Sequence, residues 1–513
     1  MKTRLPIIIF CFWALTISGK SQSDIDAAQI YRETFFTGFN ELDSVYSLGL
    51  LVRDIERTIA QSKIGKTEYG IAIHSLNNDK PYFSYNLTKP LTPASVTKLF
   101  TSFAALNLFE ADYKIPTKVF TDGYISIDSI LKGNLYLVGF GDGTFSLRDL
   151  EQLSDNVKEM GVKVIHGNIY VDGSYFDGIY ERLTYSGDKD VVVQLPPISA
   201  ISLDRNVVQA IVSSGSKAGT PLRVQYMPSS EHFSTINSAT VRGGKKRASK
   251  LRVITKAGQD GKQMFTISGN LAANRTSSFG HNLTFPEMAI AGAFKSRLEA
   301  GGIKITGSSS ATDAYHKDTS IIFTAVTEFR RPIFDILNKV NKDSDNYLAE
   351  TLFKIVGAQA DLDDDNGKSA RLFYNQLFDK YEINCENCML NDGSGLSRRN
   401  LVTPESIIRI LQESYNSSFR EEFRNSFSSA GNDGTLKKRL KSANGNSNIT
   451  AKTGTLRNVS ALAGYIDTVE GDTIAFAFIF NGPNVGIYKD LENKLAQLLA
   501  DFTYRFSVTD SYE

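Results

Sequence analysis

Three short segments carry the residue types of serine acyl-transfer chemistry, and they follow one another in a fixed order. Residues 95–98 read SVTK, residues 344–346 read SDN and residues 452–454 read KTG. A serine hydroxyl becomes an effective nucleophile only when a neighbouring base takes its proton. In this set of motifs lysine stands where many other serine hydrolases use histidine. The three segments together predict catalysis through an acyl-enzyme.

None of these motifs is specific when it is taken alone. Ser214 and Lys217 form a second S-x-x-K pair, and residues 154–156 repeat the letters SDN, whereas K-T-G occurs once. The second SDN lies in a charged stretch that is typical of a polar helix face. The order of the motifs, their flanking sequence and the expected secondary structure favour residues 95–98 and 344–346.

Each motif offers a distinct chemical group. Ser95 and Lys98 lie three residues apart on a predicted helix, so their side chains share one face. Lys98 acts as a base only if its pKa is lowered, which burial and a second cation, here Lys452, would achieve. Ser344 can pass a proton between Lys98 and the leaving group, and Asn346 can hydrogen-bond a substrate amide.

The KTG segment is predicted to lie at the end of a strand whose edge accepts an extended peptide. Gly454 permits close approach of another backbone, and the hydroxyls of Thr453 and Thr455 suit a terminal carboxylate. We expect the backbone N–H groups of Ser95 and Thr455 to form the oxyanion hole.

Metal and histidine chemistry find little support in the sequence. The five histidines have neither a G-x-S-x-G partner nor the spacing of metal ligands. Cys385 and Cys388 form a C-x-x-C pair without two further ligands nearby, which argues against a zinc site. We expect no metal and no cofactor, and we interpret the cysteine pair as structural, since such a pair in an exported protein suits a small disulfide.

The N-terminus and the charge balance limit the possible cellular locations and binding partners of the protein. Residues 1–20 have a basic start and a short apolar run followed by small and polar residues, a pattern typical of a secretory signal peptide. Their removal takes away three basic residues and changes the formal charge from +1 to −2, which argues against a nucleic-acid partner. We expect an exported protein on the periplasmic or cell-wall side of the cytoplasmic membrane. Peripheral membrane contact and the oligomeric state stay open.

The hydrophobic pattern predicts helices and strands at both ends of the chain and many short strands between them. A length of 513 residues allows about three domains. Helices are expected at residues 47–63, 95–108, 333–340, 347–356, 404–414 and 488–506, and strands at 69–74, 82–86, 449–452, 460–468 and 473–480. This order predicts one α/β domain, an antiparallel sheet flanked by helices, that is split by a long β-rich insertion from about residue 116 to 316.

The chain resembles the class C low-molecular-mass penicillin-binding proteins, the D-alanyl-D-alanine carboxypeptidase/endopeptidase family S13. The similarity extends well beyond the three motifs, from about residue 40 to the end of the chain. The blocks that carry it lie at residues 133–145, 167–177, 198–206, 340–350, 391–404, 431–440 and 451–465.

The resemblance implies a penicillin-binding, serine β-lactamase-like domain interrupted by nested β-rich domains. On this pattern residues 24–115 and 317–513 form the penicillin-binding domain. Residues 116–200 and 285–316 form a first inserted domain, and residues 201–284 form a second one nested within it.

The resemblance also implies the roles of particular residues. Ser95 would form the acyl-enzyme with Lys98 as its base, and Ser344, Asn346 and Lys452 would complete the catalytic centre. Arg398 matches a family position that contacts the carboxylate of a diaminopimelate side chain. The implied substrates are peptidoglycan stem peptides and D-alanyl cross-links, with β-lactam antibiotics as covalent inhibitors.

Two departures from the family pattern affect the expected specificity. Residues 181–197 read ERLTYSGDKDVVVQLPP where many members carry a Trp-rich stretch, and GDGTF at 141–145 replaces GDPTL. The acidic residue that would recognise the free amine of the substrate is therefore not assigned.

Two other functions share the same core. One alternative is a serine β-lactamase, although the E-x-x-x-N glutamate of class A enzymes is absent from the forty residues after Asn346. The other alternative is a wall-binding scaffold that has lost turnover.

Overall fold

The computed structural model describes most of the chain. It leaves undescribed residues 1–45, 244–249, 259–260, 441–447, 470 and 504–513. The predicted signal peptide therefore lies outside the described residues. Within the described part of the chain, no helix combines the length and the apolar character that a membrane span requires.

A six-stranded antiparallel sheet joins the two ends of the chain. Its strand order is β19-β20-β21-β22-β1-β2, and Tyr69 of β1 pairs with Phe480 of β22. The strands are β1 Glu68–Ser75, β2 Lys80–Tyr85, β19 Ser428–Ser429, β20 Ile449–Leu456, β21 Val459–Asp467 and β22 Thr473–Asn481. Strand β22 is buried along almost its whole length, which is expected of a central strand covered on both faces.

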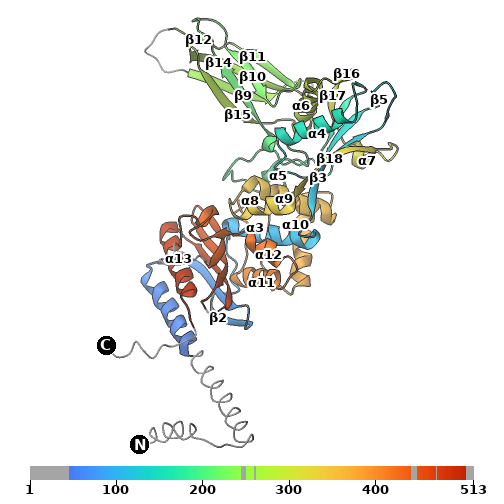
Figure 1. Cartoon of the computed structure of the whole chain (residues 1–513). Coiled ribbons are helices and arrows are strands. Elements are labelled where there is room, and N and C mark those ends of the chain that lie inside the picture. The colour runs from blue at the N-terminus through green and yellow to red at the C-terminus, as the bar shows by residue number, and fades with distance from the viewer. Residues whose placement is uncertain (1–45, 244–249, 259–260, 441–447, 470, 504–513) are drawn as a thin grey trace, which may run out of the picture.

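Helices cover both faces of this sheet (Figure 1). On one face the helical residues 46–61 and helix α13, Val485–Ala500, bury Leu51, Ile55 and Leu491 against it. The other face carries a larger apolar core that includes helices α3 and α11. The helices of this side are α3 Thr97–Leu108, α8 Ile333–Asn341, α9 Asn346–Ala360, α10 Asn366–Lys380, α11 Pro404–Tyr415 and α12 Arg420–Asn425. This arrangement confirms the predicted fold class, an antiparallel sheet flanked by helices.

The middle of the chain forms two mixed sheets, and helices α4 and α6 pack against them. One sheet has the order β17-β8-β6-β3-β18 and the other β16-β7-β5-β4. The elements are β3 Lys114–Thr121, β4 Tyr124–Ile125, β5 Ile130–Lys132, β6 Leu135–Gly139, α4 Leu147–Glu159, β7 Val164–His166, β8 Ile169–Asp172, α5 Arg182–Ser186, α6 Pro286–Ala300, β16 Lys304–Ile305, β17 Ser309–Thr312, α7 Ala314–Lys317 and β18 Thr324–Pro332.

Two further sheets project from this middle part, at the top of Figure 1. One has the order β10-β9-β15, and in the other β14 lies between β11 and β12 and also pairs with β13. The strands are β9 Val207–Ser213, β10 Arg223–Met227, β11 Phe233–Asn237, β12 Thr240–Arg242, β13 Lys250–Ala257, β14 Gln263–Ala272 and β15 Thr276–Asn282.

Local differences from the sequence expectations concern the ends of elements. Ser95 lies in a 3₁₀ turn, η2 Ala94–Val96, that precedes α3, rather than in the first turn of the α-helix. The KTG residues lie inside β20 rather than at its end.

Strand β18 lies within the range 317–513 yet pairs with β3 of the middle sheets. The division into one interrupted domain and two insertions stays a prediction.

A buried ion pair connects the middle part of the chain to helix α9. The ammonium group of Lys354 contacts both carboxylate oxygens of Asp177, and the two side chains are 0% and 5% exposed. Removal of one partner from such a pair leaves an uncompensated buried charge. We expect Lys354→Met to lower the free energy of unfolding by about 3–5 kcal/mol, measured by urea denaturation followed by circular dichroism.

The exposed ion pair of Lys368 with Asp363 provides the matched control. Because solvent screens an exposed pair, Lys368→Met is expected to leave the unfolding curve unchanged. A Lys354→Met protein that unfolds at the same urea concentration as the wild-type protein would show that the buried pair does not stabilise the fold.

Candidate active site

Ser95 and Lys98 meet at the start of helix α3, as their spacing predicts. The Lys98 side chain is fully buried, and its ammonium group donates a 3.1 Å hydrogen bond to Ser95 Oγ. Ala94, the residue before Ser95, has a φ of +49°, a region that residues other than glycine adopt rarely. The backbone at this turn is therefore held in a specific conformation that presents the serine to the lysine.

The ammonium group of Lys98 is saturated with acceptors. Besides Ser95, it donates to Asn346 Oδ1 at 2.8 Å and to the backbone oxygen of Ser394 at 2.5 Å. An ammonium group has three hydrogens to donate, so these three acceptors fix its position. Two of them come from the predicted motifs, and the third is a backbone oxygen in the family block at residues 391–404, in which only Arg398 was assigned a role from sequence.

Burial changes the acidity of both lysines of the site. Desolvation lowers the pKa of Lys98 to about 8, against the raising effect of the Glu350, Asp392 and Asp345 carboxylates. Desolvation lowers the pKa of Lys452 well below its usual value, and the charge of Lys98 lowers it further. The expectation that Lys98 has a lowered pKa agrees with this environment, with burial as the largest cause.

Ser344 and Lys452 form a second contact between predicted residues. Lys452 Nζ donates to Ser344 Oγ at 2.8 Å and to its neighbour's backbone oxygen, that of Thr453, also at 2.8 Å. Ser344 has a φ of +57°, and the next residue, Asp345, caps helix α9 by accepting from the N–H of Leu348. The cap and the strained turn hold the Ser344 hydroxyl beside Lys452.

An arginine of the middle part of the chain reinforces this turn. Arg205 lies 2.5 Å from the Asp345 carboxylate and also faces the ring of Tyr347. Arg205 belongs to the block at residues 198–206 that carries the family resemblance. This ion pair connects that block, which is distant in sequence, to the middle residue of the SDN motif.

Strand β20 passes directly beside the turn of Ser95. A Cβ atom placed on Gly454 would lie 2.5 Å from the backbone oxygen of Pro93 and 3.2 Å from the backbone nitrogen of Ser95. Only glycine allows this approach. On the same strand Thr453 donates to the hydroxyl of Thr435 at 2.9 Å.

Arg398 and the two repeated motifs make other contacts. Arg398 is exposed and donates to the backbone oxygen of Arg457 at 3.0 Å. Ser154, in the second SDN, donates to the backbone oxygen of Leu150 within helix α4. Ser214, in the second S-x-x-K, donates to the backbone oxygens of Ala272 and Arg275. The two repeated motifs therefore take part in local hydrogen bonding.

Four residues of the site were missed by the sequence analysis: Glu350, Asp392, Ser394 and Thr435. Glu350 follows Asn346 by one helical turn, so the two share a face of α9, and this spacing was a usable signal. Ser394 contributes through its backbone oxygen, which no residue pattern identifies. Its segment, DGSGLS, lies in the family block at residues 391–404, and the glycines around Ser394 indicate a tight loop.

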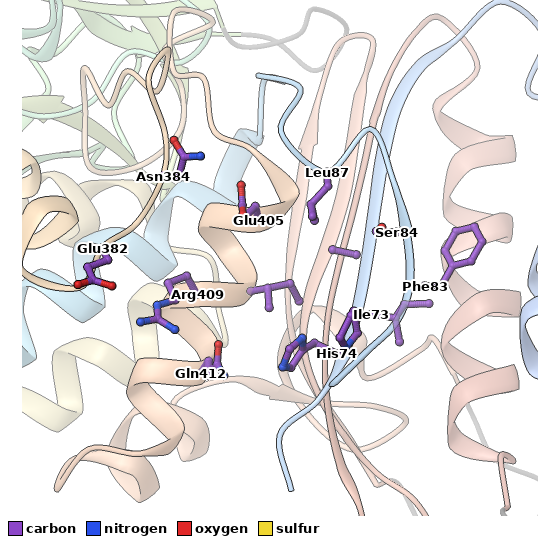
Figure 2. A pocket seen from close by; sticks show the side chains of 13 residues that line it. Ile73, His74, Phe83, Ser84, Leu87, Glu382, Asn384, Glu405, Arg409 and Gln412 are labelled. Atoms are coloured by element: carbon purple, nitrogen blue, oxygen red, sulfur yellow. The ribbon is translucent and has the colours of Figure 1, made fainter. Parts of the chain in front are cut away.

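Other candidate sites differ from this cluster. Cys385 and Cys388 form a disulfide, and the described residues contain no group of three or more histidine, cysteine or acidic side chains suited to a metal ion. A cavity of about 390 Å³ opens between strands β1 and β2 and helix α11, and Figure 2 shows His74, Glu405 and Arg409 in its lining. The lining residues include none of the predicted catalytic side chains.

The fold is that of a penicillin-binding protein. The structure of penicillin-binding protein 4 from Haemophilus influenzae matches with a TM-score of 0.67 and 23% sequence identity, covering 86% of this chain and 99% of that one. Residues 51–502 match the model of the D-Ala-D-Ala carboxypeptidase 3 (S13) family. The chain therefore belongs to this family and is a serine-type carboxypeptidase.

Curated relatives agree with this assignment over most of their length. A D-alanyl-D-alanine carboxypeptidase of Actinomadura sp. strain R39 is 26% identical over 468 residues, which are 88% of this chain and 85% of the relative. A D-alanyl-D-alanine carboxypeptidase of Haemophilus influenzae is 25% identical over 430 residues, 83% of this chain and 87% of the relative.

Proposed function

We propose that this protein is an exported D-Ala-D-Ala carboxypeptidase and endopeptidase that acts through an acyl-enzyme on Ser95. Its substrates are peptidoglycan stem peptides and D-alanyl cross-links, and β-lactams acylate the same serine. The 3.1 Å hydrogen bond between the fully buried Lys98 and Oγ of the partly exposed Ser95 is the observation that carries this proposal.

Neutral Lys98 accepts the proton of Ser95 as Oγ attacks the carbonyl carbon of the penultimate D-Ala. The tetrahedral oxyanion is stabilised by the backbone N–H groups of Ser95 and Thr455. The C–N bond then breaks, and the departing D-Ala amine receives the proton from Lys98 through Ser344. Water hydrolyses the ester and regenerates the Ser95 hydroxyl.

Substrate recognition follows from the charged and polar side chains around Ser95. Lys452 and the hydroxyl of Thr453 receive the terminal carboxylate, because an opposite charge offsets the cost of burying the Lys452 ammonium group. A carboxylate beside Lys452 would raise the pKa of Lys452. A positive charge on Lys452 lowers the pKa of Lys98, so a bound carboxylate that stabilises that charge favours the neutral base. Asn346 hydrogen-bonds the substrate amide, and Arg398 lies exposed where a side-chain carboxylate has access.

The proposed activity predicts release of D-alanine with slow turnover of β-lactams. The purified mature chain is incubated with a diacyl-L-Lys-D-Ala-D-Ala peptide, with a cross-linked muropeptide dimer, and separately with nitrocefin. We expect free D-Ala and cleavage of the dimer, detected by chromatography, with no sustained nitrocefin hydrolysis. Sustained nitrocefin hydrolysis without D-Ala release would instead indicate a β-lactamase. Inactivity in all three assays would leave the wall-binding scaffold.

A further inference from the structure

The loop that supplies the Ser394 carbonyl is held by two buried carboxylates. Asp392 accepts from the N–H groups of Gly395 and Ser397 at 2.9 and 2.8 Å. Glu350 accepts from the N–H of Ser394 at 2.8 Å. Both carboxylates are fully buried. Because four backbone N–H groups between residues 393 and 397 end on these two acids, the acids fix the shape of the loop.

A short helix of the middle part of the chain supplies the partners of both acids. Arg182, at the start of α5, lies 2.9 Å from Asp392 and 2.8 Å from Asp188. The hydroxyl of Tyr185 donates to Glu350 at 2.8 Å. Each of these side chains is at most 8% exposed. Without such partners, the burial of two charged carboxylates would strongly destabilise the folded protein.

Further contacts attach the same segment to the loop and to helix α10. Ser397 Oγ donates to Asp188 at 3.0 Å, and the guanidinium of Arg399 donates to the backbone oxygen of Gly187 at 3.1 Å. Arg371 of α10 donates to the backbone oxygen of Tyr185 at 2.9 Å. The segment lies where the sequence departs from the family pattern, at residues 181–197.

We propose that Arg182 and Tyr185 are positioning residues that hold the loop of residues 392–397 so that its Ser394 carbonyl orients Lys98. The proposal rests on the proposed function, since Lys98 needs orientation only if it is the base for Ser95. A misplacement of about 1 Å in such a group costs on the order of 100-fold in rate.

Electrostatics connects the same residues to the acidity of the base. Burial and the neighbouring Asp392 raise the pKa of Glu350 to about 7, and the hydrogen bond from Tyr185 opposes this rise. Without that hydrogen bond Glu350 would be neutral in more of the molecules, and its raising effect on the pKa of Lys98 would weaken. Besides Tyr185, the charged and titratable groups around Glu350 and Lys98 are Arg182, Asp345, Lys354, Tyr374, Asp392 and Lys452.

Tyr185→Phe tests the proposal, with Tyr180→Phe as its matched control. Tyr180 donates a hydrogen bond of the same length, 2.8 Å, to Glu287 of helix α6, which is not one of the two acids that accept from the loop. The second-order rate constant of acylation by benzylpenicillin is measured between pH 6 and 9.5 by intact-protein mass spectrometry. For Tyr185→Phe we expect about a tenfold lower plateau and a pH limb displaced to lower pH, and for Tyr180→Phe neither change.

A second pair of variants tests Arg182. Arg182→Met is expected to lose at least as much acylation rate as Tyr185→Phe. Arg182→Lys keeps a cation between Asp188 and Asp392 and is expected to recover most of that rate. The proposal is overturned if Tyr185→Phe keeps the wild-type rate and pH limb, or if both tyrosine variants fall equally. A wild-type protein that forms no adduct would refute the proposed function and this proposal with it, whereas acylated wild-type protein with unaffected variants refutes this proposal alone.

Discussion

Ser95→Ala is expected to abolish D-Ala release and β-lactam acylation, lowering kcat/KM for the stem peptide by about 10⁴- to 10⁶-fold. The substitution removes the oxygen that forms the ester and leaves the remaining hydrogen bonds of Lys98, to Asn346 and Ser394, in place. Because the fold is preserved, binding of the peptide without turnover is expected. Released D-Ala is measured with a coupled oxidase assay at saturating and at limiting peptide.

Ser214→Ala is the matched control for this variant. Ser214 and Lys217 have the same S-x-x-K spacing, yet Ser214 donates to the backbone oxygens of Ala272 and Arg275. The control should therefore release D-Ala at the wild-type rate. Residual activity of Ser95→Ala within tenfold of the wild-type value would contradict a nucleophilic role for Ser95.

Lys98→Arg is expected to reduce the acylation rate by about 10²- to 10⁴-fold, the contribution of a general base. Arginine keeps the positive charge but does not deprotonate in proteins, so it cannot take the proton of Ser95. In the wild-type protein burial lowers the pKa of Lys98 to about 8. The base is protonated below that pH and neutral above it, so kcat/KM should rise with pH and reach half of its plateau near pH 8.

The pH profile of kcat/KM between pH 6 and 9.5 measures both effects, with Lys217→Arg as the control variant. In Lys98→Arg the limb near pH 8 should disappear along with most of the rate. A wild-type profile that is flat across this range would show that Lys98 does not act as the base in the free enzyme. An unchanged limb in Lys98→Arg would assign the limb to another group.

The sequence allowed the outline of the catalytic cluster to be predicted because its side chains follow short, regular spacings. Ser95 and Lys98 are three residues apart where helix α3 begins, and Lys452 ends a stretch, residues 449–452, that was predicted to be a strand. The contacts of Lys98 with Asn346 and of Lys452 with Ser344 join residues that the motifs identify, although these two pairings were not themselves predicted. The central sheet could also be predicted from the sequence, since most of its strands carry apolar runs.

The rest of the site depends on backbone geometry and on tertiary contacts that no local pattern reveals. The Ser394 carbonyl and the positive φ of Ser344 are backbone features. Arg182 and Tyr185 act on the loop from a segment more than 200 residues away in sequence. Polar side chains in such a segment look like surface residues until the fold shows that they are buried.

Intact-protein mass spectrometry of the mature chain after incubation with benzylpenicillin, followed by peptide mapping, tests the central claim most directly. We predict one stable adduct with the mass of the drug, located on Ser95 and absent from Ser95→Ala. An adduct on another residue, or no adduct while the protein remains folded, would contradict the assignment of Ser95 as the acylated serine.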